Sequence, residues 1–153
     1  MTHIDTLIKK IEASDQEIFW LGKATLNEIE KLELLLEIHL SKSFKNFLLT
    51  FGGGGVIDSE ISGIEDNNAE LDYGGTVYGD TIRCRKDYDL PTGLVTIFFR
   101  DDEICWCLDT NKMNTKNECP VVSYNLFNKK IDSKISDDFN QFFEEYLELR
   151  ASE

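Results

Sequence analysis

Four consecutive glycines, Gly52–Gly55, interrupt the stretch Phe47–Asp58, which reads FLLTFGGGGVID. An apolar stretch with helical spacing precedes them and another apolar stretch follows, so one element must stop here before the next begins. Gly52 lies where a helix commonly ends in a left-handed residue, a conformation that glycine adopts without steric cost. The sequence therefore predicts a helix end and a tight corner at the glycines.

Glycine-rich stretches also bind phosphate, but the context here does not fit such a loop. A P-loop follows a strand and ends in Gly-Lys-Ser/Thr, and a dinucleotide site needs a strand before the glycines and a helix after them. Here the predicted helix comes first, and Val56, Ile57 and Asp58 follow without a lysine. We therefore expect no nucleotide site at the glycines.

Apolar residues at helical spacing predict five helices. They cover residues 4–14, 24–40, 42–51, 76–91 and 135–150. Thr25 with Glu28 has the capping-box spacing, Ser41 can cap the third helix, and Ser136, followed by two aspartates, can cap the last. Gly79 weakens the fourth helix, since glycine disfavours helix interiors.

Between the helices, runs rich in β-branched and aromatic residues predict strands. We expect a strand over 56–64, an exposed loop over 65–75, a hairpin over 94–109 and a strand over 120–124. The order of helices, then strands, then a closing helix is typical of an α+β fold with an antiparallel sheet packed by helices. The length of 153 residues fits one domain, residues 1–153.

The predicted helices share a core, because their apolar faces are too broad to remain in water. We expect these side chains to be buried together: Ile29, Leu32, Phe44, Phe47, Phe139, Phe142 and Phe143.

The charge balance limits the classes of partner. The formal net charge is −13 and the isoelectric point lies near 4.5. Nucleic acids and anionic membranes both require basic surfaces, so direct binding to either is disfavoured. The acidic surface of this chain attracts a cationic partner, although the same negative charge can also serve solubility alone.

The sequence predicts a cytoplasmic protein. The first residues mix charges into their apolar positions and lack the apolar core of a signal peptide, and no run approaches the ~20 apolar residues of a membrane span. We therefore expect Cys84, Cys105, Cys107 and Cys119 to be reduced thiols. Their spacing lacks the paired Cys-x-x-Cys knuckles of zinc sites, so no metal is expected.

No catalytic constellation emerges from the residue types. His3 lies near the chain end and His39 at the end of a predicted helix, so neither has the setting of a base beside a cysteine nucleophile. No Gly-x-Ser-x-Gly elbow occurs, and no carboxylate pair lies inside an apolar stretch that would raise a pKa. We expect a non-enzymatic protein without a cofactor.

Several segments together resemble one known family. They are TLNEIEKLE, SFKNFLLTFGGGG, LPTGLVTI, CLDTNKM followed by ECPVVSY, and SDDFNQFFEEYL. Through them the chain resembles the SUKH superfamily over residues 24–147; this group contains the yeast Smi/Knr cell-wall regulator and many bacterial immunity proteins. The chain departs from the pattern at Leu40-Ser41, where members usually have Leu-Pro, and at the turn 101–103, which lacks the usual glycine.

The resemblance implies the SUKH (Smi/Knr-like) α+β fold and a role in binding. The first reading is an immunity protein that neutralises a cognate bacterial toxin, often a nuclease, made by the same or a neighbouring cell. The alternative is a regulatory or scaffolding module in cell-envelope or signalling assembly. The sequence leaves the toxin's identity and the oligomeric state open.

The candidate toxin-binding surface consists of acidic residues that flank the strand 94–99. They are Asp87, Asp89, Asp101, Asp102 and Glu103. Because that strand spans only about 20 Å, both acidic groups fit within one interface of ordinary size. A basic nuclease domain is the partner that such a surface suits.

Overall fold

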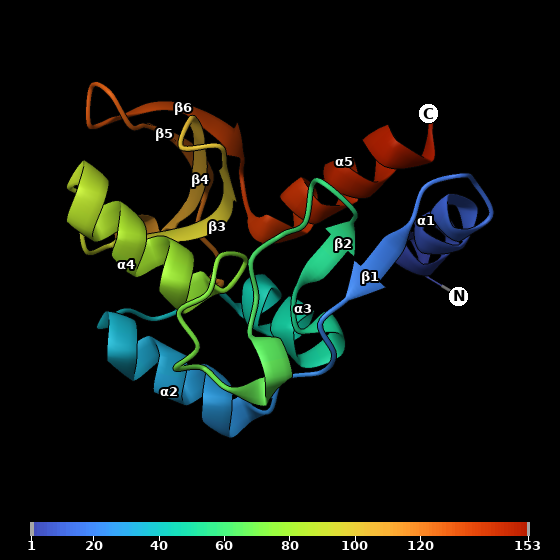
Figure 1. Cartoon of the computed structure of the whole chain (residues 1–153), viewed down its shortest axis with the longest axis horizontal. Helices are drawn as coiled ribbons and strands as arrows, with labels where there is room; N and C mark the ends of the chain where they lie inside the picture. Colours follow the sequence, from blue (N-terminus) through green and yellow to red (C-terminus); the bar gives the residue numbers. More distant parts are fainter. Residues whose placement is uncertain (1, 153) are drawn as a thin grey trace.

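The computed structural model, which describes residues 2–152, confirms the predicted α+β fold (Figure 1). Its elements in chain order are α1 (His3–Glu12), β1 (Ile18–Trp20), α2 (Leu26–Leu36), α3 (Lys42–Phe51), β2 (Gly54–Val56), α4 (Val77–Tyr88), β3 (Leu94–Arg100), β4 (Ile104–Asp109), β5 (Val121–Asn125), β6 (Lys130–Ser136) and α5 (Phe139–Ala151), with 3₁₀ turns at Glu65–Asn67 and Thr110–Lys112.

The main sheet is antiparallel, with the strand order β3-β4-β5-β6, and it is covered on both faces. Helix α4 packs on one face, where Cys84 meets Leu94 and Tyr124. Helices α3 and α5 pack with the other face, to which β3 contributes Val95 and Ile97. Because both faces of β3 are buried, its sequence reads as a continuous apolar run.

The predicted hairpin and the strand at 120–124 are confirmed, but β6 was missed. Residues 130–134 are exposed, and Lys130 and Lys134 lie on this edge strand. Lysines on an edge strand discourage pairing with other chains, and they also remove the apolar alternation by which a strand is recognised.

The expected core is confirmed for all seven residues, which are buried in one cluster. Phe47 lies at its centre, with ring centroids 5.0 Å from both Phe139 and Phe143 and 6.4 Å from Trp20. The aromatic rings therefore join β1, α3 and α5.

The glycine run ends a helix, as predicted. It also forms part of a strand, which the sequence did not predict. Gly52 caps α3 with a left-handed φ of 77°. Gly54 and Gly55 belong to β2, which pairs antiparallel with β1. The strand predicted over 56–64 is therefore wrong in its position: β2 ends at Val56, and Ile61 returns only as a single bridge to Gly54. Such close backbone pairing is possible because glycine has no side chain.

Helix ends and caps also differ from the prediction in several places. Helix α2 ends at Leu36 rather than at 40, because Glu37 adopts a left-handed conformation. Thr25 does cap α2, but the Glu28 carboxylate accepts from the Ala69 N–H instead of closing a capping box. The cap of α5 is Asp138 rather than Ser136.

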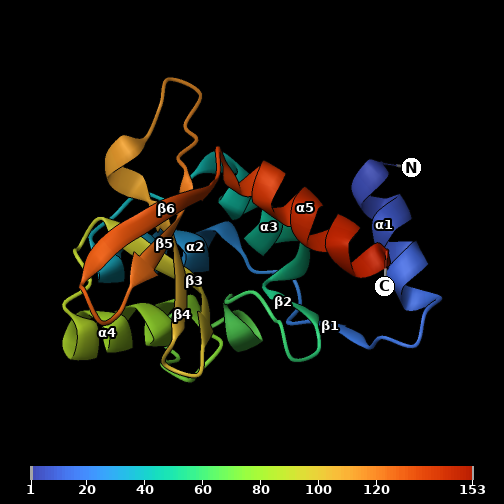
Figure 2. The same ribbon diagram turned by 90° about the horizontal axis from the view of Figure 1, so that it is seen from above.

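Helix α1 lies at the far end of the molecule from the main sheet, against α5 (Figure 2). Its N-terminus has a complete capping box between Thr2 and Asp5. Its apolar face buries Leu7, Ile8 and Ile11. Both α1 and the C-terminal part of α5 lie at this end of the molecule.

Candidate protein-interaction groove

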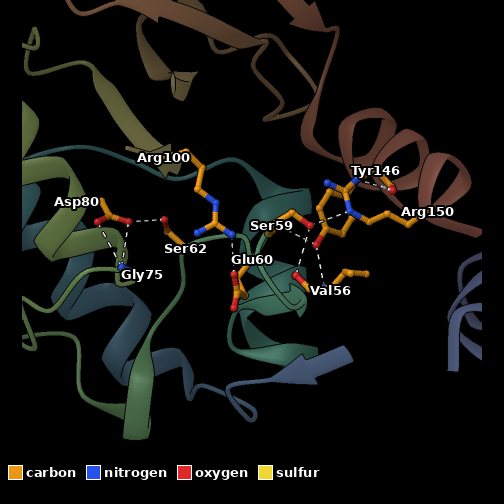
Figure 3. A network of polar contacts seen from close by, with 9 residues as sticks. All are labelled: Val56, Ser59, Glu60, Ser62, Gly75, Asp80, Arg100, Tyr146 and Arg150. Atoms are coloured by element: carbon orange, nitrogen blue, oxygen red, sulfur yellow. Dashed lines mark hydrogen bonds and ion pairs between the residues drawn. The ribbon is translucent and has the colours of Figure 1, made fainter. Parts of the chain in front are cut away.

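The segment 57–62, which leaves β2, is fixed to α5 by a network of hydrogen bonds (Figure 3). The Tyr146 hydroxyl accepts from the Val56 N–H at 2.9 Å and donates to the Ser59 carbonyl at 2.8 Å. The Arg150 Nε donates to the Ser59 hydroxyl at 2.9 Å, while its guanidinium lies over the Tyr146 ring. Gly55 must be a glycine here, since a Cβ would lie 2.4 Å from the Tyr146 hydroxyl.

The same segment is fixed at its other end to the sheet and to α4 (Figure 3). Arg100 of β3 forms an ion pair of 2.8 Å with Glu60. The Ser62 hydroxyl donates to the Asp80 carboxylate at 2.6 Å, and the Gly75 N–H also points to this carboxylate. Contacts to three separate elements leave segment 57–62 little freedom, so its side chains are presented in a fixed arrangement.

A groove of about 570 Å³ opens beside segment 57–62 and reaches the β3–β4 turn. We call it the acidic groove, because its charged lining residues are the carboxylates of Glu60, Glu65, Asp80, Asp101 and Asp102 with the guanidiniums of Arg83 and Arg100. Phe19 and Phe99 add apolar surface, and Phe19 is 60% exposed. An exposed aromatic residue beside a charged groove is a feature common to protein-binding surfaces.

Asp80 lies at the buried side of the acidic groove. Burial raises the pKa of its carboxyl, although the hydrogen bonds from Ser62 and Gly75 oppose the rise. Because the folded-state pKa is raised, the stability from this group is fully present below the ordinary carboxyl pKa, near 4, and is lost as the pH rises through the raised value.

This gives a testable pH dependence. We expect the stability of the native protein, relative to an Asp80→Asn variant, to be greatest at low pH and to fall as the pH rises from about 4. Urea unfolding of both proteins across the acidic range measures the difference. An exposed Asp15→Asn variant is the control, and a difference that stays constant or grows with pH contradicts the expectation.

The five acidic residues named from the sequence fall into three places. Asp101 and Asp102 line the acidic groove, and Glu103 is exposed in the same turn. Asp87 lies 3.6 Å from Arg83 on α4, and Asp89, at the other end of that helix from the groove, forms an ion pair with Lys129.

Arg83 contacts two of these five acidic residues, Asp87 and Asp102. It binds both oxygens of Asp102, at 2.8 and 3.0 Å, as well as contacting Asp87, and the Tyr88 hydroxyl donates to Asp102 at 2.9 Å. The charge of Asp102 is thus partly neutralised, whereas Asp101 and Glu103 have no ion-pair partner among residues 2–152. The turn holds Asp101 and Asp102 at left-handed φ of 53°, a conformation that aspartate tolerates better than most residues.

Sequence reasoning missed Glu60, Glu65 and Asp80. These residues come from three segments that only the tertiary fold brings to the β3–β4 turn. The only local signal is the cap geometry of α4, in which Thr76 caps the helix and Asp80 stands in its first turn.

The cysteines lie outside the acidic groove, and all are free and buried. The sulfur of Cys105 is 3.8 Å from that of Cys84 and 3.6 Å from that of Cys107. Contact with Cys105 and burial raise the pKa of the Cys84 thiol, and burial raises that of Cys119 to about 12. Thiols with raised pKa values are poor nucleophiles and poor metal ligands at neutral pH.

The two histidines lie in different surroundings. His39 is almost fully exposed, 4.0 Å from a Glu33 oxygen, and lies beyond the end of α2 rather than on it. His3 contacts two glutamates of α5.

Among the residues that the structure describes, no helix has the length and apolar character needed to cross a membrane.

A comparison with family models identifies the fold. The model described as SMI1-KNR4 cell-wall, of the SUKH group (SUKH_5), matches residues 4–148. The chain belongs to this family. The SMI1-KNR4 match extends the resemblance seen in the sequence toward the N-terminus, through α1 and β1. Membership is consistent with an immunity-type role, since the SUKH group is in general a non-enzymatic family of immunity and regulatory proteins.

Proposed function

We propose that this SMI1-KNR4 family protein is a non-enzymatic immunity protein that binds a cognate bacterial toxin, one with a basic nuclease domain, and blocks its surface in the cytoplasm. The observation that carries the proposal is the acidic groove, in which five carboxylates gather beside a segment fixed to three elements.

Charge gives the first argument. A nuclease must carry basic groups to hold phosphates, and those groups can bind an acidic inhibitor instead. The net charge of −13 extends the attraction beyond the groove and raises the rate of encounter.

Rigidity gives the second argument. Arg100 holds Glu60, and Arg83 holds Asp102, so two of the groove carboxylates are already ordered before a partner arrives. Binding then loses little side-chain entropy, which improves affinity without new contacts. Phe19, which lines the groove and is exposed, offers an apolar anchor for such an interface.

Rescue of growth tests the proposal directly. A candidate toxin with a basic nuclease domain, encoded next to this protein, is expressed with and without the protein, and survival is scored. We expect survival only with the protein. Continued killing by a toxin that is confirmed active would refute immunity to that toxin.

Reversing exposed charges of the β3–β4 turn gives a second prediction. We expect the double variant Asp101→Lys with Glu103→Lys to lower the association rate with the toxin about tenfold or more at low salt, and the difference to shrink as salt screens the charges. Surface plasmon resonance across salt concentrations measures both effects.

The matched control for that variant is Glu12→Lys with Asp15→Lys. It makes the same change in net charge at exposed positions outside the acidic groove. An equal loss of rate in both variants would mean that only total charge matters, and an unchanged rate in the first would remove the turn from the interface.

The family description favours one second candidate, a regulatory or scaffolding role in cell-wall assembly, because it names the cell wall. The rescue assay separates the two, since a cell-wall module has no reason to protect against a nuclease.

A further inference from the structure

Three metal-ligating side chains meet where α1 packs against α5, away from the acidic groove. The Nε2 atom of His3 lies 3.3 Å from an oxygen of Glu148 and 3.5 Å from an oxygen of Glu144. All three ligand atoms lie within 4.8 Å of one another. We propose that His3, Glu144 and Glu148 bind a divalent transition metal of the zinc type, which joins the two helices.

The distances agree with metal coordination. Zinc binds imidazole nitrogen and carboxylate oxygen at about 2.0–2.2 Å in a tetrahedron, which places neighbouring ligand atoms about 3.3–3.6 Å apart. Both distances from the His3 nitrogen fall in this range. Glu144 and Glu148 are four residues apart on one helix, so both carboxylates extend from the same face.

The charge around the cluster favours a cation. A hollow of about 540 Å³ beside it is lined by Ile4, Asp138, Asn140, Gln141, Glu144, Glu145 and Glu148. This lining contains four carboxylates and no lysine or arginine. Two glutamates at this spacing repel one another, and a divalent ion compensates both charges at once.

The ligand set selects the class of metal. Imidazole suits zinc, nickel and copper, whereas magnesium and calcium prefer oxygen ligands alone. All three side chains are about half exposed, so the ion has access from solvent, and a fourth position remains for water. A bound ion would tie the N-terminal turn of α1 to α5 and thereby stabilise the folded state.

The simpler alternative is an ion pair between protonated His3 and the two glutamates. The ion pair and the metal site predict different effects on zinc binding when the His3 imidazole is removed. An ion pair takes up no zinc, while a metal site loses affinity when its nitrogen ligand is removed, even though the acidic hollow remains.

Isothermal titration of the full chain without an affinity tag, using zinc chloride, tests the site. We expect one zinc per chain, a rise in melting temperature, and a loss of affinity of about tenfold or more in His3→Gln and Glu148→Gln. Two controls match these changes. His39→Gln removes the other histidine, and Glu12→Gln removes an equal charge from an exposed position of α1 outside the hollow, so both should bind zinc as the native protein does.

The proposal would be overturned by an absence of saturable zinc binding to the native chain, or by equal zinc binding to His3→Gln and the native chain. Equal displacement of zinc by magnesium would count the same way, because it indicates attraction to acidic surface without coordination by His3. These outcomes do not depend on toxin binding.

Discussion

Replacing Phe47 with alanine is expected to lower the free energy of unfolding by about 3–5 kcal/mol. The Phe47 side chain is 4% exposed, and its ring meets those of Phe139, Phe143 and Trp20. These partners come from α5 and β1, so the substitution removes contacts between three elements at once. Little of the cavity can close, because the surrounding rings are held by their own neighbours.

Urea denaturation of the native chain and of the Phe47→Ala variant measures this loss. Phe127→Ala is the matched control, since Phe127 is 79% exposed in the turn between β5 and β6, and we expect a change of less than about 0.5 kcal/mol. Should Phe47→Ala fail to fold, Phe47→Leu keeps most of the volume and should cost about 1.5 kcal/mol or less. Similar stabilities for Phe47→Ala and Phe127→Ala would contradict the central place given to Phe47.

The same core explains why much of the fold could be predicted from the sequence. Helices α3 and α5 have aromatic residues at helical spacing, and such faces must be buried wherever they occur. The hairpin of β3 and β4 has the residue types of strands on both sides of a polar turn. In these elements local pattern and tertiary burial agree.

The elements that were missed lack such agreement. Strand β6 is polar because it lies at an exposed edge, and β2 is built largely of glycine because β1 and the chain near Ile61 both approach it closely. The pairing partner determines both strands, and a local pattern holds no information about that partner.

The candidate site likewise contains some residues that could be predicted from the sequence and others that could not. Asp101 and Asp102 could be named from the sequence, because consecutive acids in a hairpin turn are exposed. Glu60 and Asp80 join them only through Arg100 and Ser62, over contacts that span 40 and 18 residues of chain. Convergence of this kind depends on topology, so neither composition nor spacing predicts it.

The strongest constraint in the sequence, the glycine run, leads to the second large effect. Replacing Gly52 with alanine is expected to destabilise the protein by about 2–5 kcal/mol. The φ of 77° alone costs an alanine about 1–2 kcal/mol. In addition, a Cβ on Gly52 would lie 1.7 Å from the Gly22 carbonyl oxygen, a backbone atom that cannot rotate away.

Backbone hydrogen bonds hold the chain segments on both sides of this contact, so the clash must move backbone. The Gly22 N–H donates to the Phe51 carbonyl at 2.9 Å, and the Ile64 N–H donates to the Gly52 carbonyl at 2.7 Å.

Two control variants separate the conformational cost from the steric clash in thermal and urea unfolding. Gly22→Ala has a φ of 99° but open space around its Cβ, so it should show the conformational cost alone, about 1–2 kcal/mol. Gly74→Ala has open space and no positive φ, so it should change stability by less than about 0.5 kcal/mol. If Gly52→Ala is no more destabilising than Gly22→Ala, the close approach of the two chain segments is wrong, and the first glycine of the run is required only as a helix cap.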